Sequence, residues 1–170
     1  MTEQDRNKAW GFSLFGDDVR FEMGGKSSLM GIYQSDMVFP NSVRFPIILS
    51  KFVIQINYFE LVGTIEGDLS FRVTYGSQNT PIAEMAILRK DILAMAATIP
   101  PPDSSEDSER VFNMRLPIVL SPFNIPEMGR IRVRAHYADG RLLKLGSIAV
   151  KQIPDDEFRS LTGLPILSQS

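Results

Sequence analysis

Apolar and polar residues alternate along several segments of this chain, and this pattern limits the folds open to it more than any other feature. In residues 68–75 the apolar members of the alternation are Leu69, Phe71, Val73 and Tyr75. Successive side chains of a β-strand point to opposite faces, so this pattern predicts a strand with one buried and one solvated face. Residues 51–61 repeat the pattern. Val53 and Phe59 fall on the second face there, so we expect that strand to be covered on both sides.

Turn signals separate the predicted strands along the whole chain. Glycine-rich or aspartate-rich breaks occur at 16–18, 24–26 and 76–80, and an extended run is predicted for 28–39. About eight short strands at fairly regular spacing indicate a mostly β fold, a two-sheet antiparallel β-sandwich of the immunoglobulin-like kind. A barrel is the alternative, because periodicity does not separate the two.

Two short helices are expected beside the strands. Residues 90–97 are rich in Ala, Met and Leu, which favours a helix, although the residues just before them look like a strand. Residues 154–163 begin with acidic side chains, place Phe158 and Leu161 on one face, and end at Gly163, which is typical of a short amphipathic helix.

The last hairpin, residues 130–151, permits a prediction of its register. A three-residue turn with Gly140 in the left-handed conformation pairs Tyr137 with Arg141 and turns Leu143 and Leu145 inward. Ile148 and Val150 then have the opposite phase. One extra residue reverses the alternation, so we expect a β-bulge at 146–147 to return them to the core.

The length of 170 residues fits a single β-sandwich domain spanning 1–170. Residues 99–109 combine prolines with acidic and serine residues, a composition that buries no core, so we expect a mobile surface loop there. The alternative, a domain boundary at this loop, is less favoured, because the sixty or so residues after it read as strands of the same kind.

Charge and composition exclude several classes of protein. There are 18 Lys and Arg against 20 Asp and Glu, a formal net charge of −2, which disfavours a general nucleic-acid binder. The chain has no cysteine, so disulfides, thiolate nucleophiles, iron–sulfur ligation and cysteine zinc sites are impossible. We expect no cofactor and no bound metal. The polar N-terminus lacks a signal-peptide core and no apolar run is long enough to span a membrane, so we expect a soluble, cytoplasmic protein.

Two local motifs fail as catalytic signatures. Residues 24–28 superficially resemble the end of a phosphate-binding loop, but Arg20 stands where that motif requires glycine, and no helix follows. A β-turn is the better interpretation. His136 is the only histidine, so a histidine metal cluster is excluded, and its place on an alternating strand favours an exposed sheet residue over a general base. We therefore predict no catalytic residues.

Two clusters remain as candidate binding residues. Asp17 and Asp18 form a dense acidic pair at a turn, where calcium-binding sandwiches gather aspartates, although a solvated turn is the simpler interpretation. The second cluster is a basic stripe along one strand face, formed by Arg130, Arg132, Arg134 and His136. The stripe is a solvated face or a surface for an acidic partner, a phosphate-rich ligand or the acidic residues 103–109. With Leu142 on the same face it becomes a mixed apolar and basic patch suited to a protein interface.

The chain also resembles a family through its two ends. At the N-terminal end the resemblance rests on residues 15–22 and 25–33, which follow a DDVRxExxGKxSLxGIY-like motif. At the C-terminal end it rests on residues 126–133 and the Asp139-Gly140 hairpin. These segments are similar to an uncharacterised family of small bacterial and phage β-sandwich proteins, in which 99–109 looks like an insertion. The family has no established activity, so the resemblance implies only the boundaries and a bacterial or phage origin.

Three functional hypotheses follow. The first is a non-enzymatic binding or assembly module that engages a protein partner, or a second copy of itself, through a sheet face or its loop tips. The second is a phage-derived virion or host-interaction accessory protein. The third is a carboxylate-dependent hydrolase or ligand-binding enzyme built on Asp17, Asp18 and His136.

Overall fold

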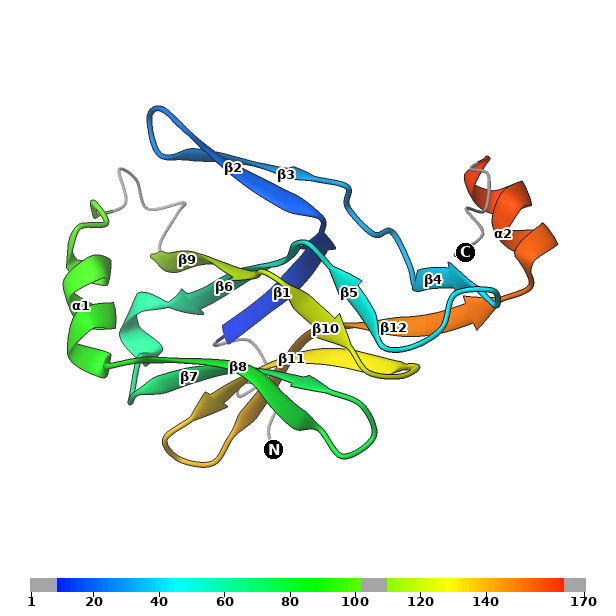
Figure 1. Ribbon diagram of the computed structural model, residues 1–170. Helices are drawn as coiled ribbons and strands as arrows, with labels where there is room; N and C mark the ends of the chain where they lie inside the picture. The colour runs from blue at the N-terminus through cyan, green and yellow to red at the C-terminus, as the bar shows by residue number, and fades with distance from the viewer. Residues whose placement is uncertain (1–8, 102–109, 164–170) are drawn as a thin grey trace.

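The computed structural model describes residues 9–101 and 110–163, and in these ranges the chain is mostly β, with two α-helices (Figure 1). The strands form a three-stranded sheet, a five-stranded sheet and two two-stranded sheets. Neighbouring strands are antiparallel except β4 and β12, which run parallel. The prediction of a mostly β fold with antiparallel sheets is confirmed.

The three-stranded sheet has the order β1-β6-β9. Its members are β1 (Ala9–Gly16), β6 (Phe52–Leu61) and β9 (Val111–Leu120). Strand β6 lies in the middle and is buried on both faces, since Val53 is buried as fully as Phe52 and Ile54. The prediction that this strand is covered on both sides is confirmed.

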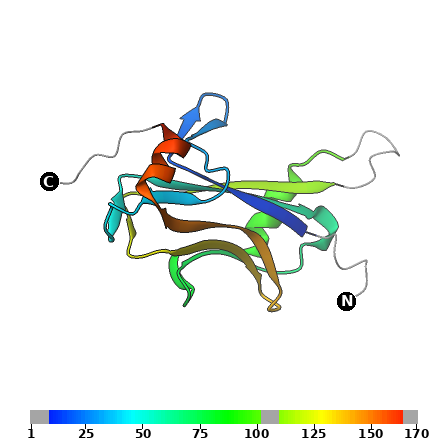
Figure 2. The ribbon, with the colours of Figure 1, turned by 90° about the vertical axis from the view of Figure 1, so that its right-hand side faces the viewer.

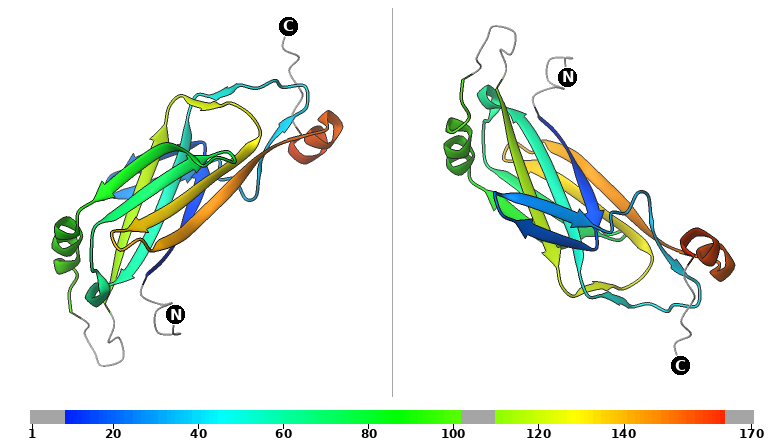
Figure 3. Two further views of the ribbon diagram at one scale, coloured as in Figure 1. Left: turned by 90° about the horizontal axis from the view of Figure 1, so that it is seen from below. Right: turned by 90° about the horizontal axis from the view of Figure 1, so that it is seen from above.

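The five-stranded sheet has the order β4-β12-β11-β7-β8 and is curled (Figure 3). Its members are β4 (Met37–Pro40), β7 (Leu69–Tyr75), β8 (Thr80–Ile87), β11 (Gly129–Tyr137) and β12 (Leu142–Ile153). The predicted alternation in β7 is confirmed, because its four apolar residues are buried while Ser70 and Arg72 on the other face are half-exposed.

The inward faces of these two sheets supply one hydrophobic core. In Figure 2 the three-stranded sheet lies above the five-stranded sheet. Strand β6 contributes Ile54, Ile56 and Tyr58, while β7 and β11 contribute residues such as Phe71 and Val133 from the opposite side. Burial of large apolar side chains stabilises such a core by roughly 1.5–3 kcal/mol for each residue.

The hairpin between β11 and β12 has the predicted three-residue turn. The amide of Tyr137 donates to the carbonyl of Arg141 at 3.0 Å, and Gly140 has φ 87°. The predicted bulge is present one residue earlier than expected: Arg134 pairs with Lys144 and Val133 with Gly146, which leaves Leu145 as the extra residue. Leu145, Ile148 and Val150 are all buried, as the bulge requires.

Two ribbons stand at the margins of the main sheets. Strands β2 (Asp18–Glu22) and β3 (Lys26–Met30) form a hairpin that crosses above the three-stranded sheet in Figure 3. The glycine-rich segment 24–25 turns this hairpin, so the β-turn interpretation is confirmed. The predicted extended run over 28–39 is wrong in its middle: β3 ends at Met30, bends follow, and β4 begins at Met37.

Strands β5 (Ile47–Leu49) and β10 (Phe123–Ile125) form the second ribbon.

The structure shows helices in both places where the sequence predicts them. Helix α1 (Arg89–Ala97) resolves the ambiguity of 90–97, and its Ile92 and Ala96, four residues apart, are buried on one face. Helix α2 (Asp155–Thr162) ends at Gly163 in the left-handed conformation. A short 3₁₀ helix also follows β6 at Val62–Thr64.

Part of the sequence-based account lies outside the described ranges. Most of the loop expected at 99–109 falls in residues 102–109, so its predicted mobility stays a prediction. Among the helices of the described residues, none is both long and apolar enough to cross a membrane.

Candidate functional site

The basic stripe lies on the outer face of the five-stranded sheet, as its alternation predicts. Strand β11 turns Ile131, Val133 and Ala135 into the core, where all three are fully buried. The intervening positions therefore point away from the core. They carry the stripe: Arg130, Arg132, Arg134 and His136.

The strand register brings two more cations beside this stripe. Arg134 pairs with Arg72 on β7 and with Lys144 on β12. Residues directly opposite each other on paired strands share a face, so these three side chains form a basic row across three adjacent strands. Like charges placed directly opposite are destabilising in a sheet, so the row stabilises the fold less than neutral pairs would.

Within the described ranges, one member of the basic row, Arg72, has an acidic partner. Arg72 Nη2 lies 3.0 Å from Glu84 Oε1, and the hydroxyl of Ser70 also donates to this oxygen at 2.8 Å. The hydrogen bond from Arg72 lowers the pKa of the Glu84 carboxyl, with Ser70 adding to the effect. Among the described residues, neither Arg134 nor Lys144 forms an ion pair.

The two remaining arginines of the stripe are held by neutral acceptors. Arg132 Nη1 donates to the carbonyl of Gly76 at 2.7 Å, and Arg130 Nη1 donates to the hydroxyl of Ser147 at 3.0 Å. These bonds fix the guanidinium groups without neutralising them. The outer face therefore keeps a positive field along β11.

Two hollows flank Arg134 on this face. The first, here the His136 hollow, has a volume of ≈ 260 Å³. It is lined by Arg72, Thr74, Asn79, Pro81, Arg134, His136 and Leu142. The second, the Ser147 hollow, has a volume of ≈ 220 Å³ and includes Arg132, Arg134, Lys144 and Ser147 in its lining. Arg134 thus borders both hollows, and every charged side chain lining either one is cationic.

The environment of His136 is positive. Burial is the largest cause that lowers the pKa of its imidazole, and the charges of Arg72 and Arg134 lower it further, while Glu84 opposes them. A histidine pKa below its ordinary value means that the ring is neutral at pH 7. Leu142 lies opposite His136 and is 47% exposed, so the expected mixed apolar and basic patch is present.

Asp17 and Asp18 have structural partners at the base of the β2–β3 hairpin. The hydroxyl of Tyr33 donates to Asp17 Oδ1 at 2.7 Å, and Lys51 Nζ donates to Asp18 Oδ1 at the same distance. The hydrogen bond from Lys51 lowers the pKa of the Asp18 carboxyl. Within the described ranges no group of three His, Cys, Asp or Glu residues is arranged to hold a metal ion. The two carboxylates anchor the hairpin.

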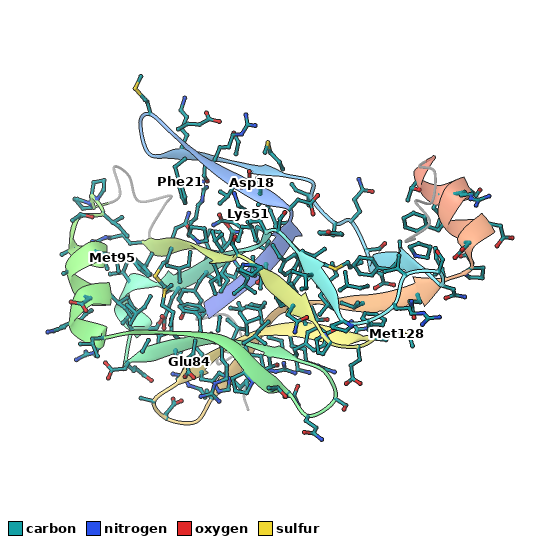
Figure 4. All side chains as sticks on the ribbon, in the orientation of Figure 1. Asp18, Phe21, Lys51, Glu84, Met95 and Met128 are labelled. Atoms are coloured by element: carbon teal, nitrogen blue, oxygen red, sulfur yellow. The ribbon has the colours of Figure 1, made fainter. Side chains whose placement is uncertain are left out.

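The structure does not bring the two candidate clusters together. His136 lies close enough to Glu84 for the two groups to affect each other's pKa. Figure 4 shows Glu84 and Asp18 on opposite sides of the molecule. An enzyme site built jointly from Asp17, Asp18 and His136 is therefore not assembled in this chain.

Sequence reasoning missed three residues of the basic face. Arg72 stands on the polar side of the alternating segment 68–75, and Lys144 follows the predicted hairpin turn, so each was visible as an outward-facing residue. Their position beside Arg134 depends on which strands pair, and β7 and β11 lie far apart in the sequence. The place of Thr74 in the wall of the His136 hollow also depends on the pairing of β7 with β11, so the sequence did not indicate it.

No protein-family model matches this chain, and a search of the curated proteins finds no match to it. The resemblance of its two ends to a bacterial and phage family therefore stays an expectation.

Proposed function

We propose that this chain is a binding module that holds an acidic segment of a partner protein on the outer face of its five-stranded sheet. The basic row of Arg72, Arg134 and Lys144 is the observation that carries the proposal. Among the described residues, Glu84 is the carboxylate in the row of Arg72 and Arg134, and Asp36, which is already bonded to Lys151, interacts with Arg130 at the other end of the stripe. The whole chain has a net charge of −2, so this cationic row does not simply reflect a basic protein.

An anionic partner would remove an unfavourable feature of the free protein. Arg134 lies between two other cations, and the nearest acid in its row is already shared by Arg72 and Ser70. A carboxylate beside Arg134 or Lys144 would replace like-charge repulsion with charge-assisted hydrogen bonds. The hollows on either side of Arg134 give such groups room to approach.

The composition of the face favours a protein over a nucleic acid. Single-stranded nucleic acids bind to platforms of exposed aromatic rings among cations. The rows of this face carry Leu142, Pro81 and small hydroxyl residues between the cations, and no Phe, Tyr or Trp points outward in them. An apolar side chain among arginines is typical of protein interfaces.

The binding test uses a fluorescein-labelled decapeptide of alternating Glu and Ala, measured by fluorescence anisotropy. We expect saturable binding that weakens as salt is added, because exposed charges are screened. Arg134→Gln and Lys144→Gln should each weaken the binding about tenfold, since hydrogen bonds to charged groups contribute roughly 1.5–3 kcal/mol. The matched control is Arg115→Gln, which removes the same charge from an exposed position on β9 and should leave binding unchanged.

Three results would overturn the proposal. The first is no binding of the peptide at low salt. The second is an equal loss of binding in Arg115→Gln and Arg134→Gln, which would show that only net charge matters. The third is tighter binding of a labelled thymidine decanucleotide at the same residues, which would assign the face to nucleic acid.

The architecture behind this proposal is a two-sheet β-sandwich of the immunoglobulin-like kind. The shared core between the three-stranded and five-stranded sheets supports it. The parallel pairing of β4 with β12 and the curl of the larger sheet depart from a simple sandwich.

A second copy of the chain is the alternative partner. Light scattering that detects only a monomer at high concentration would remove it.

A further inference from the structure

The His136 hollow lies between β7, β8, β11 and β12 on the basic face. Thr74 forms part of its wall and is 7% exposed. The Oγ1 atom of Thr74 is covered by its surroundings and has no hydrogen-bond partner within the described part of the chain. The groups that the hollow offers to a ligand are therefore those of its other polar lining residues.

The other polar groups of this hollow are mostly hydrogen-bond donors. Arg134 has no acidic partner among residues 9–101 and 110–163, and Arg72 shares Glu84 with Ser70. The side-chain amide of Asn79 lies at the β7–β8 turn, where the residue has φ 53°, a conformation that asparagine tolerates better than most residues. Two guanidinium groups, an amide and an imidazole therefore surround one space of ≈ 260 Å³.

This set of donors suits an anion with several oxygens. A phosphate monoester carries nearly two negative charges at pH 7 and three strong acceptor oxygens. A carboxylate has two oxygens and one charge, so it leaves more of these donors unused. Arginine forks match phosphate oxygens in pairs, and two arginines line this hollow.

We infer that the His136 hollow binds a phosphate monoester, presented by a phosphorylated serine or threonine in the acidic segment of the partner protein. This inference rests on the proposed function, because the phosphate group is one residue of the segment that lies along the basic face. Arg134 and Arg72 hold the phosphate oxygens, while Thr74 and Asn79 complete the wall of the hollow.

His136 offers a direct readout, because it is the only histidine in the chain. The charged groups that face it are Arg72 on β7, Glu84 on β8 and Arg134 on β11, while Leu142 on β12 is uncharged. A bound dianion beside the ring favours the imidazolium form. Phosphate binding should therefore raise the pKa of His136 toward or above its ordinary value.

The experiment follows the ring protons of His136 by NMR as a function of pH. Three probes are added separately: inorganic phosphate, a decapeptide of Glu and Ala with one phosphoserine, and the same peptide with glutamate at that place. We expect phosphate and the phosphopeptide to raise the pKa of His136. The phosphopeptide should bind about tenfold more tightly than the glutamate peptide, because charge-assisted bonds to phosphate are stronger and more numerous.

Variants separate the hollow from the rest of the face. Arg134→Gln should abolish the effect of phosphate on His136, and Glu84→Gln should strengthen it by freeing Arg72. Thr74→Val keeps the shape of the wall and removes only a covered hydroxyl, so phosphopeptide binding should be unchanged. Because this hydroxyl has no partner among the described residues, the folded protein should be at least as stable. Arg115→Gln, on β9, is the control and should behave as the parent protein.

The possible failures are distinguishable. If the glutamate peptide binds but neither phosphate nor the phosphopeptide changes the pKa of His136, the phosphate inference is wrong and the proposed function stands. If no peptide binds, both are wrong. If phosphate binds but the phosphopeptide gains nothing over the glutamate peptide, the phosphorylated partner is excluded.

Discussion

The hydroxyl of Tyr58 lies 2.6 Å from Oε2 of Glu60, and both side chains are buried at the end of the core. Glu60 is 4% exposed, although it carries an ionisable carboxyl group. The same Tyr58 hydroxyl lies 3.0 Å from the hydroxyl of Tyr137. Burial raises the pKa of Glu60, and the hydrogen bond from Tyr58 only partly opposes this effect.

Glu60 should make the stability of the protein depend on pH. Its pKa in the folded state is raised, so its contribution to stability is fully present below the unfolded value near 4.5 and is lost as pH rises through the folded value. Glu60→Gln keeps an acceptor for Tyr58 but cannot ionise. We expect the melting temperature of the variant, relative to the parent protein, to increase from pH 4.5 to pH 7.5. A difference that stays constant or decreases over this range would contradict the assignment.

Removing the donor should destabilise the same cluster. Tyr58→Phe leaves the buried carboxyl of Glu60 without its hydrogen bond, and we expect a loss of about 1–3 kcal/mol in urea unfolding at pH 7. Tyr137→Phe is the comparison, because it leaves the contact between Tyr58 and Glu60 intact and should cost less. Equal losses in the two variants would show that Glu60 does not depend on Tyr58.

Close packing between the sheets should make Gly11 intolerant of a side chain. A Cβ atom at this position would overlap the carbonyl oxygen of Asn57 and lie 2.7 Å from Cδ2 of Leu145. We expect Gly11→Ala to destabilise the protein by about 1–3 kcal/mol, as overpacking of a core does. Gly63→Ala is the control, because a Cβ there has nothing within 4 Å, and it should change stability little. Similar midpoints for both variants in urea would argue against this packing.

The arginines of the basic stripe should differ in their structural roles. Arg132 donates to the carbonyls of Gly76 and Arg130, so Arg132→Ser should cost about 1 kcal/mol of stability. Arg134 makes no ion pair within the described ranges and sits between two cations, so Arg134→Ser should change stability by less than about 0.5 kcal/mol. Thermal unfolding of the two variants measures the difference. A larger loss for Arg134→Ser would show that its side chain is packed or paired.

Much of the local structure followed from the sequence because it depends on near neighbours. The alternation in 68–75 and 130–137 predicted which residues of β7 and β11 are buried, since the side-chain period of a strand is fixed. The turn around Gly140 was also predictable from its composition. The bulge was misplaced by one residue, because alternation shows that a phase change occurs between Leu145 and Ile148 without showing where.

The arrangement of the candidate site required the strand order. No local pattern pairs β11 with β7, so Arg72 could not be assigned to the basic row from sequence. The burial of Glu60 was hidden for a similar reason: its partner Tyr58 is two residues away, but Tyr137 is distant in the chain. Asp17 and Asp18 suggested a solvated turn, with a ligand cluster as the alternative, because their partners Tyr33 and Lys51 come from elsewhere in the chain and could not be identified from local sequence.

The most direct measurement of the central claim maps the surface that an acidic peptide contacts. Backbone amide resonances of the ¹⁵N-labelled protein are recorded as the Glu-Ala decapeptide is added. We predict that the largest shifts surround Arg72, Arg134 and Lys144 on β7, β11 and β12. Shifts confined to the β2–β3 hairpin and the outer face of the three-stranded sheet would contradict the claim.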